Sequence, residues 1–250
     1  MTKKAILFLL PLFLLMPSIV YASSLNVLPL KVFITPDKKT DSLVLKNEGD
    51  ETVTIKVKVY EWTQNDKGAD ITEKAAEDIA YMPKILTINA KGEGRIKIGY
   101  NYDKGSEPAE RTYRIIIEEV PQSFTSDTPV LKIALRISVP IFIAPSKKAV
   151  PSGKITGVNT SKGALSFDIE NTGKTHFQIT KASVAILDAS GKEIGNVPIK
   201  SWYVLSGKKR PHSAEIPPDI CKTAAKLAMT AEAAGLTLKE TVNVDKKMCN

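Results

Sequence analysis

Alternation of apolar and polar residues dominates this chain, and the stretch from Leu131 to Val139 shows it best. Every second position there is large and apolar, and the set is Leu131, Ile133, Leu135, Ile137 and Val139. A period of two places all five side chains on one face of a β-strand. That face covers the protein's own core or, if the strand lies at a sheet edge, serves a partner. Alternation alone leaves both interpretations open.

The same period recurs along much of the first half of the chain. A second clear example is the run Val53, Ile55, Val57 and Val59, which alternates with threonine and lysine. About seven such runs, separated by turn-forming residues and without a helical period, predict an immunoglobulin-like sandwich. The polar stretch Gln64–Asp78 interrupts them and predicts a long loop.

The second half of the chain is also strand-like, so the predicted fold is all-β, with two immunoglobulin-like sandwiches in an L-shaped, boomerang-like arrangement. Pro145–Gly153 is polar and bounded by prolines, which is typical of a linker. The predicted division is a signal peptide over 1–22, a first sandwich over 23–145, a linker over 146–152 and a second sandwich over 153–250.

The C-terminal end predicts a closing β-hairpin with a disulfide. Ala224–Ala234 is rich in alanine and could be mistaken for a helix, but its larger apolar residues also fit a strand that turns at Gly235. Cys221 and Cys249, the two cysteines of the chain, each lie 14 residues from that glycine. Direct pairing would place Leu227 opposite Asn243, so we expect a bulge or an irregular segment near Pro217-Pro218 to correct the register.

The N-terminus predicts export. Lys3 and Lys4 precede an apolar segment, and small residues at Val20 and Ala22 fit cleavage after Ala22. An exported protein favours a Cys221–Cys249 bond over free thiols. The formal charge is +8, and loss of the two lysines leaves +6. The basic residues are scattered and lack a basic face with interleaved aromatics, so nucleic-acid binding is not expected.

Catalytic and metal-binding patterns are absent from the sequence, and we expect neither an enzyme nor a cofactor. His176 and His212 both stand beside turn residues, outside any metal-ligand spacing, and are interpreted as exposed loop histidines. Glu118 and Glu119 are adjacent on a predicted strand and therefore point to opposite faces. That geometry argues against two carboxylates acting on one substrate.

Several segments together resemble the PapD-like periplasmic chaperones of chaperone–usher pilus assembly, and in particular their archaic branch. The matching segments are Pro29–Phe33, Leu45–Asn47, Tyr60–Gln64, Pro83–Ile88, Arg95–Gly99, Tyr113–Pro121, Leu131–Pro145 and Asn171–His176. The most specific is Leu131–Pro145, which ends in Arg-Ile-Ser-Val-Pro-Ile-Phe-Ile-Ala-Pro.

The resemblance implies that the chain binds pilus subunits in the periplasm, completes their fold and delivers them to an outer-membrane usher, without a cofactor. A subunit is a sandwich that lacks its last strand, and chaperones of this family lend it one. By resemblance, the donor face would be Leu131, Ile133, Leu135, Ile137 and Val139. An exposed edge of this kind is also compatible with a self-capping oligomer of the free protein.

The resemblance also implies basic residues that anchor the C-terminal carboxylate of the subunit. Lys31, before Val32-Phe33, is the nearest match to the arginine that usually stands in the first strand. The second anchor is usually a lysine late in the donor strand, but Pro140 occupies that position here. Arg136, on the same face as Pro140, is the predicted substitute, with Lys97 or Arg114 behind it.

Two other functions remain open at this point. The chain could be an exported pilus subunit or adhesin, although such proteins should carry an N-terminal donor extension and an incomplete domain. It could also be a general exported binding module with PapD-like domains. Capture of a pilin-like protein in one-to-one stoichiometry distinguishes the chaperone from both.

Overall fold

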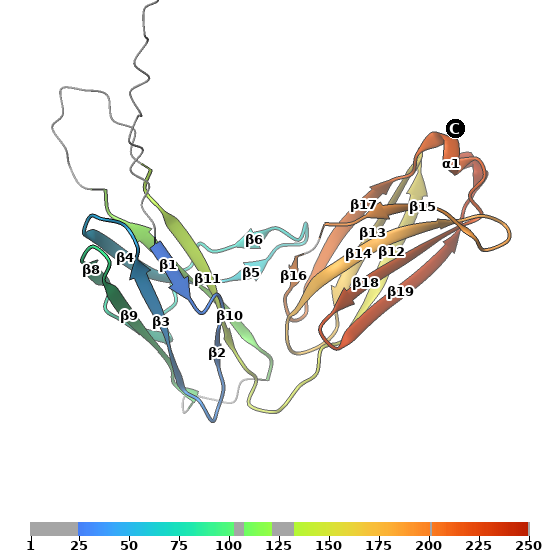
Figure 1. Ribbon diagram of the computed structural model, residues 1–250. Helices are drawn as coiled ribbons and strands as arrows, with labels where there is room; N and C mark the ends of the chain where they lie inside the picture. Colours follow the sequence, from blue (N-terminus) through green and yellow to red (C-terminus); the bar gives the residue numbers. More distant parts are fainter. Residues whose placement is uncertain (1–24, 103–107, 122–132, 201, 250) are drawn as a thin grey trace, which may run out of the picture.

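The computed structural model describes residues 25–102, 108–121, 133–200 and 202–249 (Figure 1). The predicted signal peptide, its cleavage site and Leu131 of the predicted donor face lie outside the described residues. Nearly all regular structure in the described part consists of β-strands, so the all-β prediction is confirmed. Neither described helix, a single turn each, is long and apolar enough to cross a membrane.

The first half of the chain folds into two facing sheets. One sheet has the order β1 (Leu25–Leu28), β3 (Thr40–Asn47), β9 (Glu93–Tyr100) and β7 (Ile79–Met82). The other has the order β2 (Val32–Ile34), β11 (Arg136–Ile143), β10 (Arg111–Glu119), β4 (Val53–Glu61) and β8 (Ile85–Ile88). The alternating apolar residues point inward from both sheets and form one core, as the period of two predicts.

The stretch predicted as a long loop is in fact partly paired. β5 (Thr63–Gln64) and β6 (Asp70–Ile71) form a small hairpin that leaves the first sandwich and extends toward the second (Figure 1). The sequence prediction missed it because two residues per strand are too few to show a period. Its hydrogen bonds to the second sandwich hold it in place.

The second half of the chain forms another sandwich around a core of its own. One sheet contains β12 (Gly153–Ser161), β13 (Ala164–Asn171) and β17 (Lys209–Glu215). The other contains β15 (Glu193–Pro198), β14 (Phe177–Leu187), β18 (Lys226–Ala233) and β19 (Leu236–Asn243), with β16 (Tyr203–Val204) paired to β14.

The predicted closing hairpin and its disulfide are both confirmed. β18 and β19 pair around Gly235, and Leu227 lies opposite Val242 instead of Asn243. The cysteines therefore do not face each other on the strands. Cys221 ends the short helix α1 (Pro218–Cys221), and Cys249 ends a 3₁₀ turn (Lys246–Cys249). These irregular segments bring the two Cα atoms to 5.7 Å and the sulfurs into a bond.

The two sandwiches lie side by side at an angle, joined by one chain crossing and bridged by the β5–β6 hairpin (Figure 1). No described sheet contains strands from both halves. We propose that the domain boundary follows the segment 146–152, which carries no strand and connects β11 to β12.

Candidate functional site

One edge of β11 is open over half of its length. Strand β10 pairs with β11 from Arg136 to Ile143, whereas β2 pairs with it only at Ile141, Phe142 and Ile143. Within the described residues, the backbone from Arg136 to Val139 therefore has no strand on its second side. An edge of this kind presents unpaired N–H and C=O groups to another chain.

The apolar face of this strand passes from the core into solvent along its length. Val139 is 2 % exposed and belongs to the core of the first sandwich. Ile137 is partly buried against that core and Leu135 is half-buried. Ile133, which lies before the strand begins, is 61 % exposed.

This gradient divides the predicted donor face. The prediction is wrong for Val139, because its side chain is buried in the protein's own core. Ile133 and Leu135 continue the same face beyond the sandwich, so they are accessible, and Ile137 lies at the transition. The core interpretation of the alternating stretch therefore holds at Val139, and the face from Ile133 to Leu135 is left accessible.

A buried cation lies on the strand next to β11. Arg114 on β10 lies directly opposite Pro140. Its guanidinium carbon lies 3.7 Å from the ring centroid of Trp62 and 5.9 Å from that of Tyr203. The residue is only 9 % exposed, and within the described chain it makes no hydrogen bond or ion pair through its side chain. Burial lowers the pKa of Arg114, an effect that the charge of Asp70 opposes.

Such a guanidinium lacks the partner that a buried charge needs. A buried cation is stable when a hydrogen-bonded anion compensates its lost hydration. Beneath it, the Nε1 of Trp62 is buried without a hydrogen-bond partner among the described residues. Cationic and N–H donors that have no acceptor of their own are suited to an anion supplied from outside.

Lys31 reaches the same place from the segment before β2. Its Nζ donates a hydrogen bond of 2.7 Å to Gln178 Oε1 on β14 and lies 5.3 Å from the centroid of the Tyr203 ring. Lys31 and Arg114 thus share Tyr203 as a common wall. The structure brings together the first predicted anchor and one of the two residues, Lys97 and Arg114, that were placed behind Arg136 as substitutes.

The other predicted anchors lie elsewhere. Arg136 donates a hydrogen bond of 2.9 Å to Glu118 Oε1, and its side chain is 66 % exposed. It is four residues from Pro140, about 13 Å along a strand. Lys97 belongs to β9, in the sheet on the far side of the core. Arg136 therefore belongs to a surface ion pair with Glu118. Neither Arg136 nor Lys97 lies with Lys31 at Tyr203.

The apolar side chains beside these cations form a buried cluster between the two sandwiches. Trp62 and Phe142 come from the first sandwich, and Tyr203 and Leu205 from the second. The Trp62 and Tyr203 rings meet edge to face with centroids 5.3 Å apart. Sequence reasoning used Trp62 only as part of a family segment, because nothing in a strand pattern shows that an outward aromatic will be covered by another domain.

His176 joins the two sandwiches as well, so its interpretation as an exposed loop residue is wrong. Its ring stacks on Phe142 with centroids 3.7 Å apart, and its Nδ1 lies 2.6 Å from Glu110 Oε1. The same carboxylate oxygen accepts the backbone N–H of His176 at 3.0 Å. The Glu110 side chain is only 6 % exposed.

His212 is not an exposed loop histidine either. It lies on β17 and stacks on Phe167, with its Nε2 buried and unpartnered among the described residues. Burial and the nearby charge of Arg210 lower its pKa to about 4. Its role is structural, and within the described residues no cluster of His, Cys, Asp and Glu could hold a metal ion.

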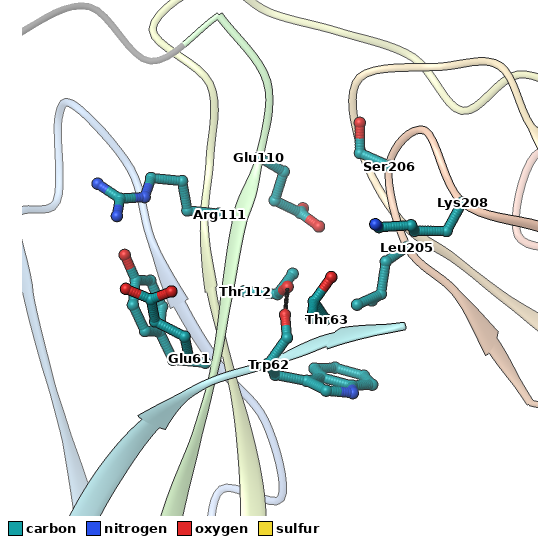
Figure 2. A pocket seen from close by; sticks show the side chains of 10 residues that line it. Glu61, Trp62, Thr63, Glu110, Arg111, Thr112, Leu205, Ser206 and Lys208 are labelled. Carbon is teal, nitrogen blue, oxygen red and sulfur yellow. Dashed lines mark hydrogen bonds between the residues drawn. The ribbon is translucent and has the colours of Figure 1, made fainter. Parts of the chain in front are cut away.

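A pocket of about 220 Å³ opens where β10 begins and the second sandwich approaches (Figure 2). Its walls are Glu61, Trp62, Thr63, Glu110, Arg111, Thr112, Tyr113, Leu205, Ser206 and Lys208. Figure 2 shows the Glu110 carboxylate and the Lys208 ammonium pointing across it toward each other. With charges of both signs and no nucleophile–base pair in the part of the chain described, the pocket offers no catalytic constellation.

Comparison with known proteins identifies the family. Residues 24–149 match the model of the pili and flagellar-assembly chaperones, PapD N-terminal domain. The probable fimbrial chaperone EcpB of Escherichia coli (strain K12) is 24 % identical over 209 residues, which cover 81 % of this chain and 86 % of EcpB.

Solved structures agree on the fold. A chain of the CsuC–CsuE chaperone–adhesion subunit complex of the archaic Csu pili of Acinetobacter baumannii matches with a TM-score of 0.58 at 17 % identity, covering 86 % of this chain and 98 % of that one. The SafA pilin–SafB chaperone complex of Salmonella enterica gives a TM-score of 0.58 at 14 % identity, with 88 % and 97 % coverage. With its family match spanning half of its length, this chain belongs to the pili and flagellar-assembly chaperones that share the PapD N-terminal domain.

Proposed function

We propose that this protein captures pilus subunits in the periplasm by lending them an edge strand, and that it delivers them to an outer-membrane usher. The open side of β11, with apolar side chains emerging beside it, carries the proposal. Membership of a family of assembly chaperones, which are not enzymes, supports it. So do solved relatives described as complexes of a chaperone with a pilin or an adhesion subunit.

The donor face in this proposal is Ile133, Leu135 and Ile137, together with Leu131, which lies outside the described residues. A subunit groove that buried these side chains would gain roughly 1.5–3 kcal/mol for each, before the cost of ordering the segment. The backbone between Arg136 and Val139 would meanwhile pair with the open edge of the subunit. Side chains would give register and backbone hydrogen bonds would give affinity.

We further propose that Lys31 and Arg114 bind the C-terminal carboxylate of the subunit. Arg114 replaces Arg136 in this role, because it is buried beside Tyr203 and has no hydrogen-bonded anion among the described residues, whereas Arg136 already has Glu118. The indole of Trp62 fixes the plane of the guanidinium, which favours a planar anion. The anchor and the donor strand then hold one end and one edge of the same subunit.

The test uses co-purification from periplasmic extracts. The wild-type chain should elute one-to-one with a pilin-like protein identified by mass spectrometry. Leu135→Asp should abolish the complex while thermal unfolding stays unchanged, because the side chain is only half-buried in the free protein. Ser138→Asp, on the same strand but on the opposite and exposed face, is the matched control and should retain the complex. A stable complex with Leu135→Asp would refute the donor strand.

A further inference from the structure

The β5–β6 hairpin belongs to the first sandwich by sequence but makes its contacts with the second. An isolated two-stranded hairpin is marginal in water, and this one pairs only Thr63 with Ile71 and Gln64 with Asp70. It extends across to β16 (Figure 1). Its place in the structure therefore depends on what it binds there.

Gln64 makes the central contact. The side chain is 2 % exposed, and its Oε1 accepts a hydrogen bond of 3.1 Å from the backbone N–H of Leu205. Its Nε2 donates to the backbone oxygen of Tyr203 at 2.9 Å and to Asp70 Oδ1 at 3.0 Å. Both N–H groups of the amide are thus used. The side chain binds the backbone on both sides of Val204, as an additional strand would.

Other residues of the hairpin also make hydrogen bonds to the second sandwich. Asp70 Oδ2 accepts a hydrogen bond of 2.9 Å from the indole Nε1 of Trp202. At the tip, the backbone oxygen of Gly68 accepts a hydrogen bond of 2.6 Å from Arg210 Nη1. Gly68 has a φ of +72°, and a Cβ at this residue would lie 2.9 Å from the side chains of Arg210 and Pro211. Only glycine meets both requirements.

The segment that Gln64 binds includes Tyr203, whose ring borders the proposed carboxylate site. The backbone oxygen of Tyr203 accepts one of the hydrogen bonds of Gln64, and Lys31 and Arg114 both approach the Tyr203 ring. Those cations come from the first sandwich and Tyr203 from the second. Their relative positions therefore depend on contacts between the sandwiches.

We infer that the hairpin of residues 63–71 is a positioning strut for subunit recognition, and that Gln64 is its key residue. The inference rests on the proposed carboxylate site. Gln64 does not touch the ligand. It fixes the position of Tyr203 relative to Lys31 and Arg114. It thereby determines how strongly the proposed carboxylate site prefers a carboxylate to a neutral chain end.

The experiment compares N-acetyl-Ala-Ala-Tyr as a free acid and as its amide, titrated into the full ¹⁵N-labelled chain. The chain has two tryptophans, so their indole N–H signals report separately on Trp62 beneath Arg114 and on Trp202 at the hairpin. In the wild type, the acid should bind about tenfold more tightly than the amide and shift the Trp62 signal. In Gln64→Met the preference should fall to about twofold or less, with binding of the amide unchanged.

Two further variants sharpen the result. Gly68→Ala disturbs the hairpin from its other end and should reduce the preference in the same way. Lys67→Met introduces the same side chain at the exposed tip, next to the contact with Arg210, and should retain the wild-type preference. Full preference in both Gln64→Met and Gly68→Ala would overturn the strut. Equal weakening of acid and amide would also overturn it, because the hairpin would then act on folding alone. A wild type without preference would instead refute the carboxylate site itself, and the strut with it.

Discussion

Arg114 lies directly opposite Pro140 on the paired strands β10 and β11. Both residues face away from the core of the first sandwich. A proline cannot supply a charge, but its neighbour across the ladder projects on the same face within about 5.5 Å. The cation that this family's pattern leads one to expect on β11 is thus available from β10.

Replacing Arg114 by Gln should weaken capture of the subunit. The guanidinium is buried and without a hydrogen-bonded anion in the free protein, so its interaction with a carboxylate should contribute about 2–3 kcal/mol, or about 30- to 150-fold in Kd. Calorimetric titration with the purified subunit measures this. The free chaperone should not be destabilised, since removal of an uncompensated buried charge offsets the lost contact with Trp62.

Arg136→Gln is the matched control for that experiment. It removes an arginine from the neighbouring strand that pairs with Glu118 at the surface, and exposed pairs contribute little. Its effect on Kd should stay within about twofold. If Arg136→Gln weakened capture more than Arg114→Gln, the assignment of the anchor would have to be reversed.

His176→Phe should loosen the joint between the two sandwiches. Phenylalanine can keep the stacking on Phe142 but cannot pair with Glu110, whose buried carboxylate would lose one of its partners. We expect a broader distribution of interdomain angles in small-angle X-ray scattering and faster hydrogen exchange at the backbone N–H of residue 176.

Glu110→Gln offers the complementary change. The amide oxygen can still accept the backbone N–H of residue 176, so the joint should be weakened less than by His176→Phe. Scattering profiles of both variants that superimpose on the wild type would show that the aromatic cluster alone holds the sandwiches.

The stability of the second sandwich should fall as the pH drops from 6.5 toward 4. The pKa of His212 is lowered from 6.5 to about 4 in the folded state, chiefly by burial. In this window the unfolded chain binds a proton that the folded chain does not, so unfolding is favoured at lower pH. The loss should be about 2 kcal/mol by pH 4, after allowance for partial exposure.

His212→Phe should reduce this pH dependence and raise the melting temperature at pH 4.5, because it keeps a ring on Phe167 and removes a buried, unpartnered nitrogen. Calorimetric scans at pH 4.5 and pH 7 measure both effects. An unchanged difference between the two scans would assign the acid sensitivity to other groups.

Loss of the Cys221–Cys249 bond should destabilise the second sandwich. The bond closes a loop with a sequence separation of 28 and ties α1 to the C-terminal turn. Its removal by the double change to serine should cost about 3–4 kcal/mol. Thermal unfolding should show the second sandwich melting earlier while the first is unaffected. A single, uniformly lowered transition would mean instead that the two sandwiches unfold together.

The sequence by itself determined the longer strands, because burial of one sheet face imposes a period of two that runs of several residues show. It also located the closing hairpin around Gly235 and the pairing of Cys221 with Cys249. It also named the stretch that contains the proposed donor face, since Ile133 to Val139 alternate without interruption.

Only the tertiary structure decided where that face leaves the core. Val139 and Ile133 have the same pattern, and they differ because the facing sheet covers one of them and not the other. The difference in burial between Arg114 and Arg136 was equally invisible in the sequence, since both are outward-facing arginines on strands. A second domain that covers Arg114 with Tyr203 buries its charge and leaves Arg136 in water, and contacts between residues this far apart in sequence leave no local pattern.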